Sequence, residues 1–376
     1  MKRHAWLSFL LSLLRPGLGL FYKGQLIKGL IIDCSYMLLN NVLLVLIAIY
    51  SCNRVVNVLS IFIIFISYLV LAVYSAKTSI DIGTTFVPGK LNKWYYYIVY
   101  FICLTCMVNY PLNRFVIKYF ANAYRLPTPV MEGTILRGDF IIADHTVFKA
   151  KKEPGLNDVI IFKYFGVKQK DYIKRIIGCS GQKIRIIKTD IFVNDEKIDN
   201  PPFSKHIRHG FNPQFQDAYE VTVPSPNDII PVAELNLRDF MYLYHLVKQE
   251  NSNVAAEVHV YNGGELQNTK SLSDFDNWLQ LKRHLVKTIP SLGECKINNY
   301  LTVNGEVIER YQVKYRNYFV MGDNRDNSFD SRYYGYVNDK SIKGKAKVVY
   351  WSVDNGVPFY DIIHWIRWNR IGKTIQ

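Results

Sequence analysis

Three long stretches without a formal charge occur within the first 112 residues of this 376-residue chain. They are Cys34–Asn53, Val55–Tyr74 and Trp94–Leu112, and each is 19 or 20 residues long. An α-helix needs about 20 predominantly apolar residues to cross a bilayer. Because such stretches separated by short loops leave no polar face for a soluble domain, the sequence predicts a multi-span membrane region over residues 1–115, with spans at about 30–50, 55–75 and 94–112.

The distribution of lysine and arginine predicts how these spans are oriented. Five basic residues precede the first span, one separates the first span from the second, and three precede the third: Lys2, Arg3, Arg15, Lys23 and Lys28, then Arg54, then Lys77, Lys90 and Lys93. Cytoplasmic loops carry the excess of positive residues. We therefore expect a multi-pass protein of the cytoplasmic (inner) membrane with a cytoplasmic N-terminus, and everything after about residue 113 across the membrane.

The first apolar run, Ala5–Leu14, is too short to span and is followed by Arg15-Pro16 rather than by a small-x-small cleavage site. This pattern favours an interfacial or re-entrant segment over a removable signal peptide. The net charge of +15 is explained in part by the basic cytoplasmic rim and by contact with anionic lipid headgroups. With no DNA- or RNA-binding motif present, we predict the lipid bilayer as a partner and no nucleic acid.

Beyond Arg125 the pattern changes to short β-type runs bounded by Gly, Asn and Asp, which is typical of an antiparallel domain. Helical spacing returns at 232–250 and 273–287, on either side of a strand and turn with the sequence AEVHVYNGG. The last residues mix Trp and Ile with Arg and Lys, as an interfacial helix does. We predict a mostly-β extracytoplasmic domain over 116–204 and 296–356, an α/β insertion over 205–295, and a C-terminal amphipathic, membrane-interfacial helix over 357–376.

The most unusual motif is GDNRDNSFDSRYYG at residues 322–335. It is not a calcium loop, because with Asp323 as the first ligand Arg325 takes the third position and Ser328 replaces the glycine at the sixth. So many Asp, Asn and Arg residues in one turn are more typical of a site held together by charge-assisted hydrogen bonds.

This motif closely resembles the most distinctive box of the type I signal peptidases, which are membrane-bound serine endopeptidases with a Ser/Lys dyad. IKRIIG (173–178) resembles the family's lysine box, NDVIIFKY (157–164) the strand before it, and PTPVMEGTILRGD (127–139) the nucleophile box. The resemblance covers roughly residues 125–200 and 298–355, and PGLGLFYKGQ (16–25) resembles the N-terminal extension of some members. It implies a signal-peptidase-like β domain that handles signal peptides of exported preproteins without a metal or other cofactor.

The resemblance also implies a role for each matching residue. Lys174 is the general base, which must be uncharged to act and can be so when buried. Ser328 orients the lysine, and Asp330 and Arg332 form the supporting ion pair. Thr128 is the hydroxyl that helps to bind the oxyanion. Substrate contacts are implied for Met131, Asp171, Tyr172 and Ile173.

At the nucleophile position the match fails, because the alignment places Val130 on the family's serine and Gly133 on its proline. No serine occurs between Ser79 and Ser180, so no shift of the alignment supplies one. Losing the serine of a hydrolase triad costs about 10⁶-fold in turnover. The lysine box also departs from the family, with Cys179, Ser180 and Gln182 where Leu, Pro and Asp are usual.

Three interpretations follow from the sequence. In the first, the chain is a non-catalytic relative that binds signal peptides through backbone hydrogen bonds, with an active peptidase paralogue as a partner. In the second, Thr128 or Thr134 replaces the serine as nucleophile. In the third, the β domain is a scaffold and the insertion binds a partner. A buried lysine is costly unless paired. If the chemistry is lost, we therefore expect Lys174 to have acquired a new partner.

Cysteine and histidine add little to these interpretations. Only Cys179 and Cys295 belong to the external part, and whether they pair is left open. His206 and His209 lack a carboxylate or cysteine to complete a ligand set, which favours a surface loop over a metal site.

Overall fold

The computed structural model describes residues 4–50, 54–81, 93–148, 153–164, 170–187, 189–200, 219–289 and 292–375. The chain divides into two compact units, which we treat separately. The N-terminal unit comprises Met1–Arg125, Gly138–Ala150 and Lys347–Thr374. The site unit comprises Leu126–Arg137, Lys151–Ala346 and the last two residues.

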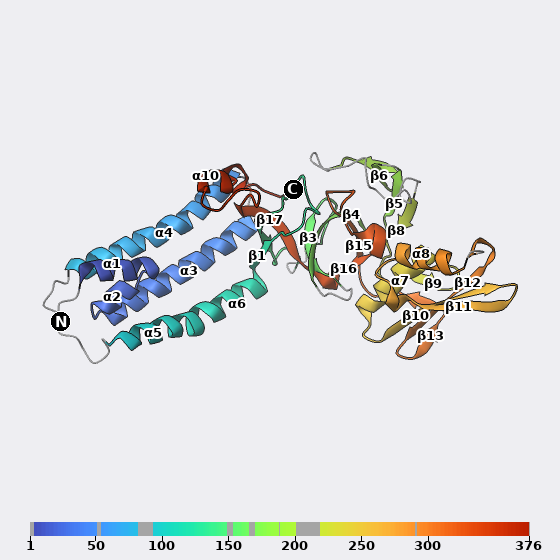
Figure 1. Cartoon of the computed structure of the whole chain (residues 1–376), viewed down its shortest axis with the longest axis horizontal. Helices are drawn as coiled ribbons and strands as arrows, with labels where there is room; N and C mark the ends of the chain where they lie inside the picture. Colours follow the sequence, from blue (N-terminus) through green and yellow to red (C-terminus); the bar gives the residue numbers. More distant parts are fainter. Residues whose placement is uncertain are drawn as a thin grey trace. The chain divides into compact units, whose positions relative to one another are not determined.

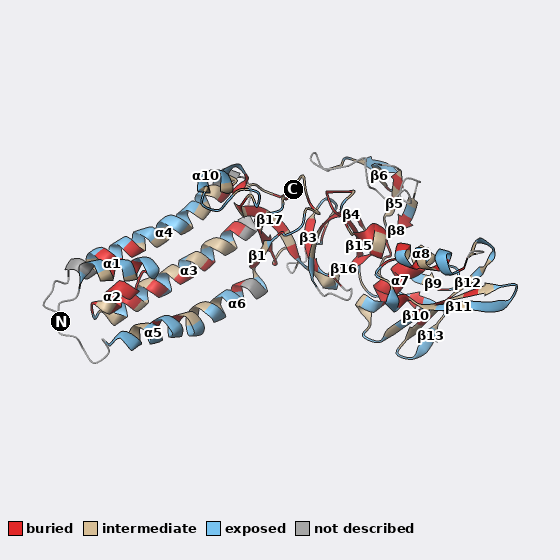
Figure 2. Cartoon of the chain, viewed as in Figure 1, coloured by how far each residue is buried: buried red, intermediate tan, exposed pale blue. Residues whose placement is uncertain are grey.

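The N-terminal unit is built from long apolar helices (Figure 1). Segments within α3 (Leu26–Tyr50), α4 (Arg54–Asp81) and the α5–η1–α6 run are long and apolar enough to cross a membrane: Leu26–Ile47, Asn57–Thr78 and Trp94–Val116. These three helices confirm the expected apolar spans. Few of their residues are buried, as the colours on α3, α4 and α5 in Figure 2 show, and exposed apolar residues suit a lipid environment.

The third helix continues further than its apolar sequence suggested. It consists of α5 (Trp94–Cys103), a π-helical stretch η1 (Leu104–Asn109) and α6 (Tyr110–Tyr119). The helix therefore ends at Tyr119, beyond the end of the predicted third span at residue 112. Pro111 directly follows the π-helical stretch, and the helix continues past it to Tyr119.

The short helices α1 (Ala5–Leu14) and α2 (Leu18–Tyr22) are held to the long ones by a buried carboxylate. Asp33 on α3 is 3.3 Å from Arg15 Nε, and it accepts hydrogen bonds from Tyr100 Oη (2.5 Å) and from the backbone N–H of Gly17 (3.0 Å). A Cβ on Gly17 would lie 2.1 Å from Gly29 O. The PGLG sequence thus permits a close approach of α2 to α3, and the carboxylate fixes it.

The C-terminal segment does not form the single helix expected over 357–376. It contains one short helix, α10 (Ile362–Trp365), and a 3₁₀ turn, η6 (Trp368–Arg370). Isolated β-bridges join Ile366 to Val353 and Thr374 to Val348, and Arg370 pairs with the buried Asp139. The bridges take up backbone hydrogen-bonding groups that a continuous helix would use within itself, and the ion pair fixes the side chain of Arg370 on Asp139. The segment still exposes apolar side chains: Phe359, Tyr360, Ile362, Ile363 and Trp368.

Outside the insertion, the site unit contains strands of two antiparallel sheets, and the N-terminal unit contains one further strand pair. In the site unit, the order β17-β3-β4-β15-β16 joins the first half of β17 (Ile342–Ser352) to β3 (Val159–Lys163), β4 (Asp171–Cys179), β15 (Asn317–Met321) and β16 (Val337–Asn338). In the N-terminal unit, β1 (Ala121–Arg125) pairs with β2 (Asp139–Asp144). The second sheet of the site unit has the order β7-β6-β5-β8, from Glu196–Ile198, Asp190–Val193, Lys183–Ile187 and Tyr219–Thr222.

The insertion contains the expected helices, α7 (Leu237–Glu250) and α8 (Trp278–Thr288), and the expected strand, β10 (Val254–Asn262), which is followed by β11 (Glu265–Ser271). Its boundary at 295 was too early, because β12 (Lys296–Val303) pairs with β10 and with β13 (Glu306–Ile308). β14 (Arg310–Gln312) then pairs with β9 (Ile229–Pro231). Residues 205–218 lie outside the described residues. One hydrophobic core joins insertion and sheet, with Ile177 and Phe319 packed among the same residues as Phe240 and Leu281.

Candidate functional site

Lys174 lies in the middle of β4, where its backbone faces Ile160 of β3. Its side chain is 2% exposed, and Nζ is 5.7 Å from the centroid of the Tyr172 ring, which lies two residues away on the same face of the strand. Among the described residues, no hydrogen bond or ion pair reaches the amine. Burial lowers the pKa of Lys174 to about 8, a shift that Asp330 opposes and Arg332 reinforces.

Asp330 and Arg332 form the ion pair expected beneath the lysine. Arg332 Nε and Nη2 donate to the two carboxylate oxygens of Asp330 at 2.8 and 2.9 Å, and both side chains are buried. Asp330 also accepts from the backbone N–H of Gly322 at 3.1 Å. Burial alone would raise the pKa of Asp330, but the charge and hydrogen bonds of Arg332 hold it below its usual range. The pair is thus ionised and neutral as a whole.

A second buried ion pair, which the sequence did not single out, lies on the opposite face of β4. Arg175 Nε and Nη2 donate to Asp323 at 2.8 and 2.7 Å, and Nη1 donates to the carbonyl of Asn157 at 2.8 Å. Arg175 Nη2 also donates to Thr134 Oγ1 at 3.3 Å. Because neighbouring strand residues point to opposite faces, this bond places the Thr134 hydroxyl on the side away from Lys174.

The segment with Val130 is docked onto the loop 322–330 through its backbone. Asn324 donates its N–H to the carbonyl of Val130 (3.2 Å) and its Nδ2 to that of Pro129 (3.1 Å). A Cβ on Gly322 would lie 2.6 Å from Val130 O and 2.2 Å from Ser328 Oγ. The glycine therefore lets Val130 and Ser328 approach each other, so the segment on which we expect the family's nucleophile position is packed against the loop.

Two further polar side chains of the loop are buried without partners in the part of the chain that the structure describes. Ser328 is 6% exposed, and its Oγ has no hydrogen bond. The expected bond from Ser328 to the lysine is therefore not formed, and its orienting role stays a prediction. Arg325 is 3% exposed, its Nε is also unpartnered, and burial lowers its pKa to about 10. With both aspartates already paired, the buried cluster carries an excess of positive charge, which favours a neutral lysine.

The remaining predicted residues differ in how much of them a peptide could reach. The side chain of Thr128 is exposed, whereas that of Met131 is fully buried, so only the backbone of Met131 is available. Asp171 at the start of β4 pairs with Lys343 at 2.7 Å. Tyr172 stacks on Tyr164 with ring centroids 4.6 Å apart. Ile173 is half-buried on the face opposite Lys174 and Tyr172.

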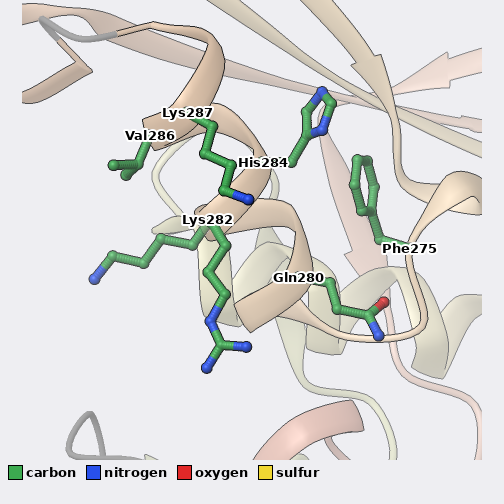
Figure 3. Close-up of a pocket in the computed structure, with 7 residues that line it drawn as sticks. Phe275, Gln280, Lys282, His284, Val286 and Lys287 are labelled. Carbon is green, nitrogen blue, oxygen red and sulfur yellow. The ribbon is translucent and has the colours of Figure 1, made fainter.

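A hollow of about 540 Å³ on α8 is lined by Phe275, Gln280, Lys282, Arg283, His284, Val286 and Lys287. Figure 3 shows Lys282 pointing away from Phe275 and His284, whose rings are 5.4 Å apart. The side chains do not converge on one point, so we assign no binding site there.

Metal and disulfide chemistry find no support in the described residues. There, no three His, Cys, Asp or Glu side chains group as metal ligands, and Cys179 and Cys295 are not joined by a disulfide. His206 and His209 lie outside the residues described.

The fold and the site together define a class. A β domain preceded by apolar helices carries a buried lysine that has no hydrogen bond or ion pair among the described residues, and the loop with Ser328 and the Asp330–Arg332 ion pair belongs to the same domain. Residues 91–351 match the family described as signal peptidase, peptidase S26. The chain belongs to this signal peptidase family.

Several individual proteins are similar to the chain. A signal peptidase I of Aquifex aeolicus is 32% identical over 239 residues, covering 63% of this chain and 78% of the relative. One from Buchnera aphidicola (subsp. Acyrthosiphon pisum) is 27% identical over 274 residues, covering 70% and 78%. A crystal structure of a signal peptidase I from Enterococcus faecalis matches with 16% identity and a TM-score of 0.20, covering 52% of this chain and 97% of that one.

Proposed function

We propose that this membrane protein binds the signal peptides of exported preproteins at a signal-peptidase site and does not cleave them efficiently. One observation carries the proposal: the segment that should present a hydroxyl to Lys174 is docked on the loop 322–330 and presents Val130. A valine side chain has no lone pair with which to attack a carbonyl. Asp171, Tyr172 and Ile173 pair with β3 on one side, but the pairing of β15 with β4 begins only at Arg175, which leaves their other side for an extended peptide to pair with.

A second candidate is an active peptidase that uses a threonine. The expectation of a new partner for Lys174 is not met among the described residues, and an unpaired amine with a lowered pKa is still suited to act as a base. Thr134 is a poor candidate because its hydroxyl is bonded to Arg175. Thr128 is exposed and thus remains as the alternative nucleophile.

The proposed location is the cytoplasmic (inner) membrane, with a cytoplasmic N-terminus and the site on the other side. The three candidate spans and the surplus of lysine and arginine around the first of them support it. The exposed Phe359, Tyr360 and Trp368 support contact of the C-terminal segment with the membrane interface. An active peptidase paralogue that receives the bound peptide is a proposed partner.

The test titrates a fluorescent signal peptide onto the full chain in detergent, and mass spectrometry of the same samples detects cleavage. We expect saturable binding and an intact peptide. Val130→Arg, which puts a long charged side chain at the nucleophile position, is expected to weaken binding at least tenfold. Lys287→Gln, an exposed change on α8, serves as the matched control and is expected to bind like the parent. Absence of saturable binding would refute the proposal, and a shortened peptide would favour Thr128.

A further inference from the structure

The insertion contacts the site through one face of helix α7. Tyr242, His245 and Gln249 have the spacing i, i+3, i+7, so their side chains lie along the same side of the helix. Each bonds to the backbone of the segment that follows Asp330. Tyr242 Oη donates to Arg332 O (2.6 Å), His245 Nδ1 to Tyr334 O (2.9 Å), and Gln249 Nε2 to Tyr336 O (2.9 Å).

The bonds recur at every second residue of that segment. Gln249 also accepts, through Oε1, the backbone N–H of Asn338 at 3.1 Å. From α8, Trp278 Nε1 donates to Arg332 O at 2.9 Å, which adds a second donor to the oxygen that Tyr242 already contacts. Side chains of the insertion thus bond to residues 332, 334, 336 and 338 in register, much as a neighbouring strand would.

The segment depends on this support because it has little structure of its own. Helix α9 (Ser331–Tyr334) is four residues long, and so short a helix is not stable by itself in water. Gly335 ends it with φ +86°, and a Cβ there would lie 2.8 Å from the Tyr242 ring. His245 is buried, and burial lowers its pKa to about 4, so it is neutral at pH 7 and its Nδ1–H can donate to the carbonyl.

The segment that α7 and α8 support carries charged groups that act on Lys174, the proposed base. Arg332 belongs to α9 and Asp330 caps it by accepting from the N–H of Arg332. Three ionised groups act on Lys174, namely Asp330, Arg332 and Asp323, and the Tyr172 ring faces its amine.

We propose that Tyr242, His245 and Gln249 of α7, together with Trp278 of α8, position the Asp330–Arg332 ion pair and keep water away from Lys174. The insertion then helps to set the environment in which Lys174 acts as a base. This inference goes beyond peptide binding and holds whether the chain cleaves peptides or only binds them.

The test compares the parent with the double variant Tyr242→Phe/Trp278→Phe, which keeps both positions aromatic and removes both donors to Arg332 O. The full chain in detergent is labelled with a small amine reagent across pH 6 to 11, and mass spectrometry reports the modification of Lys174. We expect a midpoint near 8 for the parent. In the variant, admitted water stabilises the ammonium, so the midpoint rises by at least one pH unit and the neutral fraction at pH 8 falls about fivefold.

Two controls separate positioning from simple destabilisation. Val258→Ala removes buried volume in β10 of the insertion without touching α9, and we expect it to lower thermal stability while leaving the midpoint of Lys174 unchanged. Lys282→Gln, on the exposed side of α8, is expected to change neither. An unshifted midpoint in the double variant, or an equal shift in Val258→Ala, would overturn the proposal.

Discussion

The lysine side of the site, around Lys174, and the proposed nucleophile side, around Val130, are tied together by Asn324, yet their side chains contribute to the site in different ways. On the lysine side, Arg175 and Asp323 form a buried ion pair that holds the strand β4 to the loop, and Asp330 and Arg332 form a second one within the loop and α9. On the nucleophile side, position 130 contributes through its backbone carbonyl, and its side chain is only half-buried.

This difference indicates which positions can be substituted at little cost in stability. Removing one partner of a buried ion pair leaves an uncompensated charge, so substituting one of these residues costs stability whether or not the chain is an active enzyme. Under the proposed function, a serine at position 130 would have a chemical role, but the side chain there takes part in no such ion pair. Lys174 differs from both the ion-paired residues and position 130. It is buried and has no ion pair or hydrogen bond among the described residues, so its presence lowers stability.

The largest expected effect comes from Val130→Ser. If the lysine side is intact, a restored hydroxyl meets a competent base, and preprotein cleavage should rise by about 10³ to 10⁶-fold over the parent. The measurement is cleavage of a preprotein by the full chain in liposomes, with Val130→Ser/Lys174→Ala as the blank for contaminating peptidase. Absence of preprotein cleavage by Val130→Ser would mean that the lysine side has only a structural role. Cleavage by the parent, lost in Lys174→Ala, would mean that another hydroxyl has taken over.

Next in size is the cost of breaking the ion pair beneath the lysine. Arg332→Leu leaves Asp330 buried without its partner, and we expect the free energy of unfolding to fall by about 3–5 kcal/mol. Denaturant unfolding of the full chain in detergent measures it, with Val130→Ala as the matched change on the nucleophile side. We expect that control to cost about 1 kcal/mol or less, since most partly exposed positions tolerate truncation. Equal losses would remove the structural distinction between the two sides.

The smallest effect is expected at Lys174 itself. Its pKa is about 8 in the folded state against 10.5 for a free lysine, so the unfolded chain binds more protons between these values and stability rises with pH across that window. Below pH 8 the buried ammonium costs up to about 3 kcal/mol. Lys174→Met should therefore stabilise the chain at pH 7 and do so much less at pH 10.5. A stabilisation independent of pH would show that the amine is not held with a lowered pKa.

The sequence predicted those parts of the structure that a pattern of neighbouring residues determines. The uncharged stretches predicted the three apolar helices, and the order of the boxes led to Lys174, Asp330 and Arg332. Within the insertion, helical spacing at 232–250 and 273–287 predicted α7 and α8.

Contacts between distant segments could not be predicted in this way. The pairing of β10 with β12 moved the end of the insertion, because a strand pattern does not say which strand is its neighbour. The same holds for Tyr242 and Trp278, which meet Arg332 O across 90 and 54 residues of sequence. Continuous helix at the C-terminus was predicted from composition alone, and the pairing of Arg370 with Asp139, 231 residues away, had no local signal.

The carboxylate of Asp33 has a consequence for biosynthesis. Arg15 leaves the ribosome 18 residues before the partner that neutralises it, and an arginine alone in hydrocarbon is costly. We therefore expect the first two helices to wait at the bilayer surface until α3 has been made, and then to settle against it as one inserting group. The order of synthesis thus becomes part of how this end of the chain reaches its native arrangement.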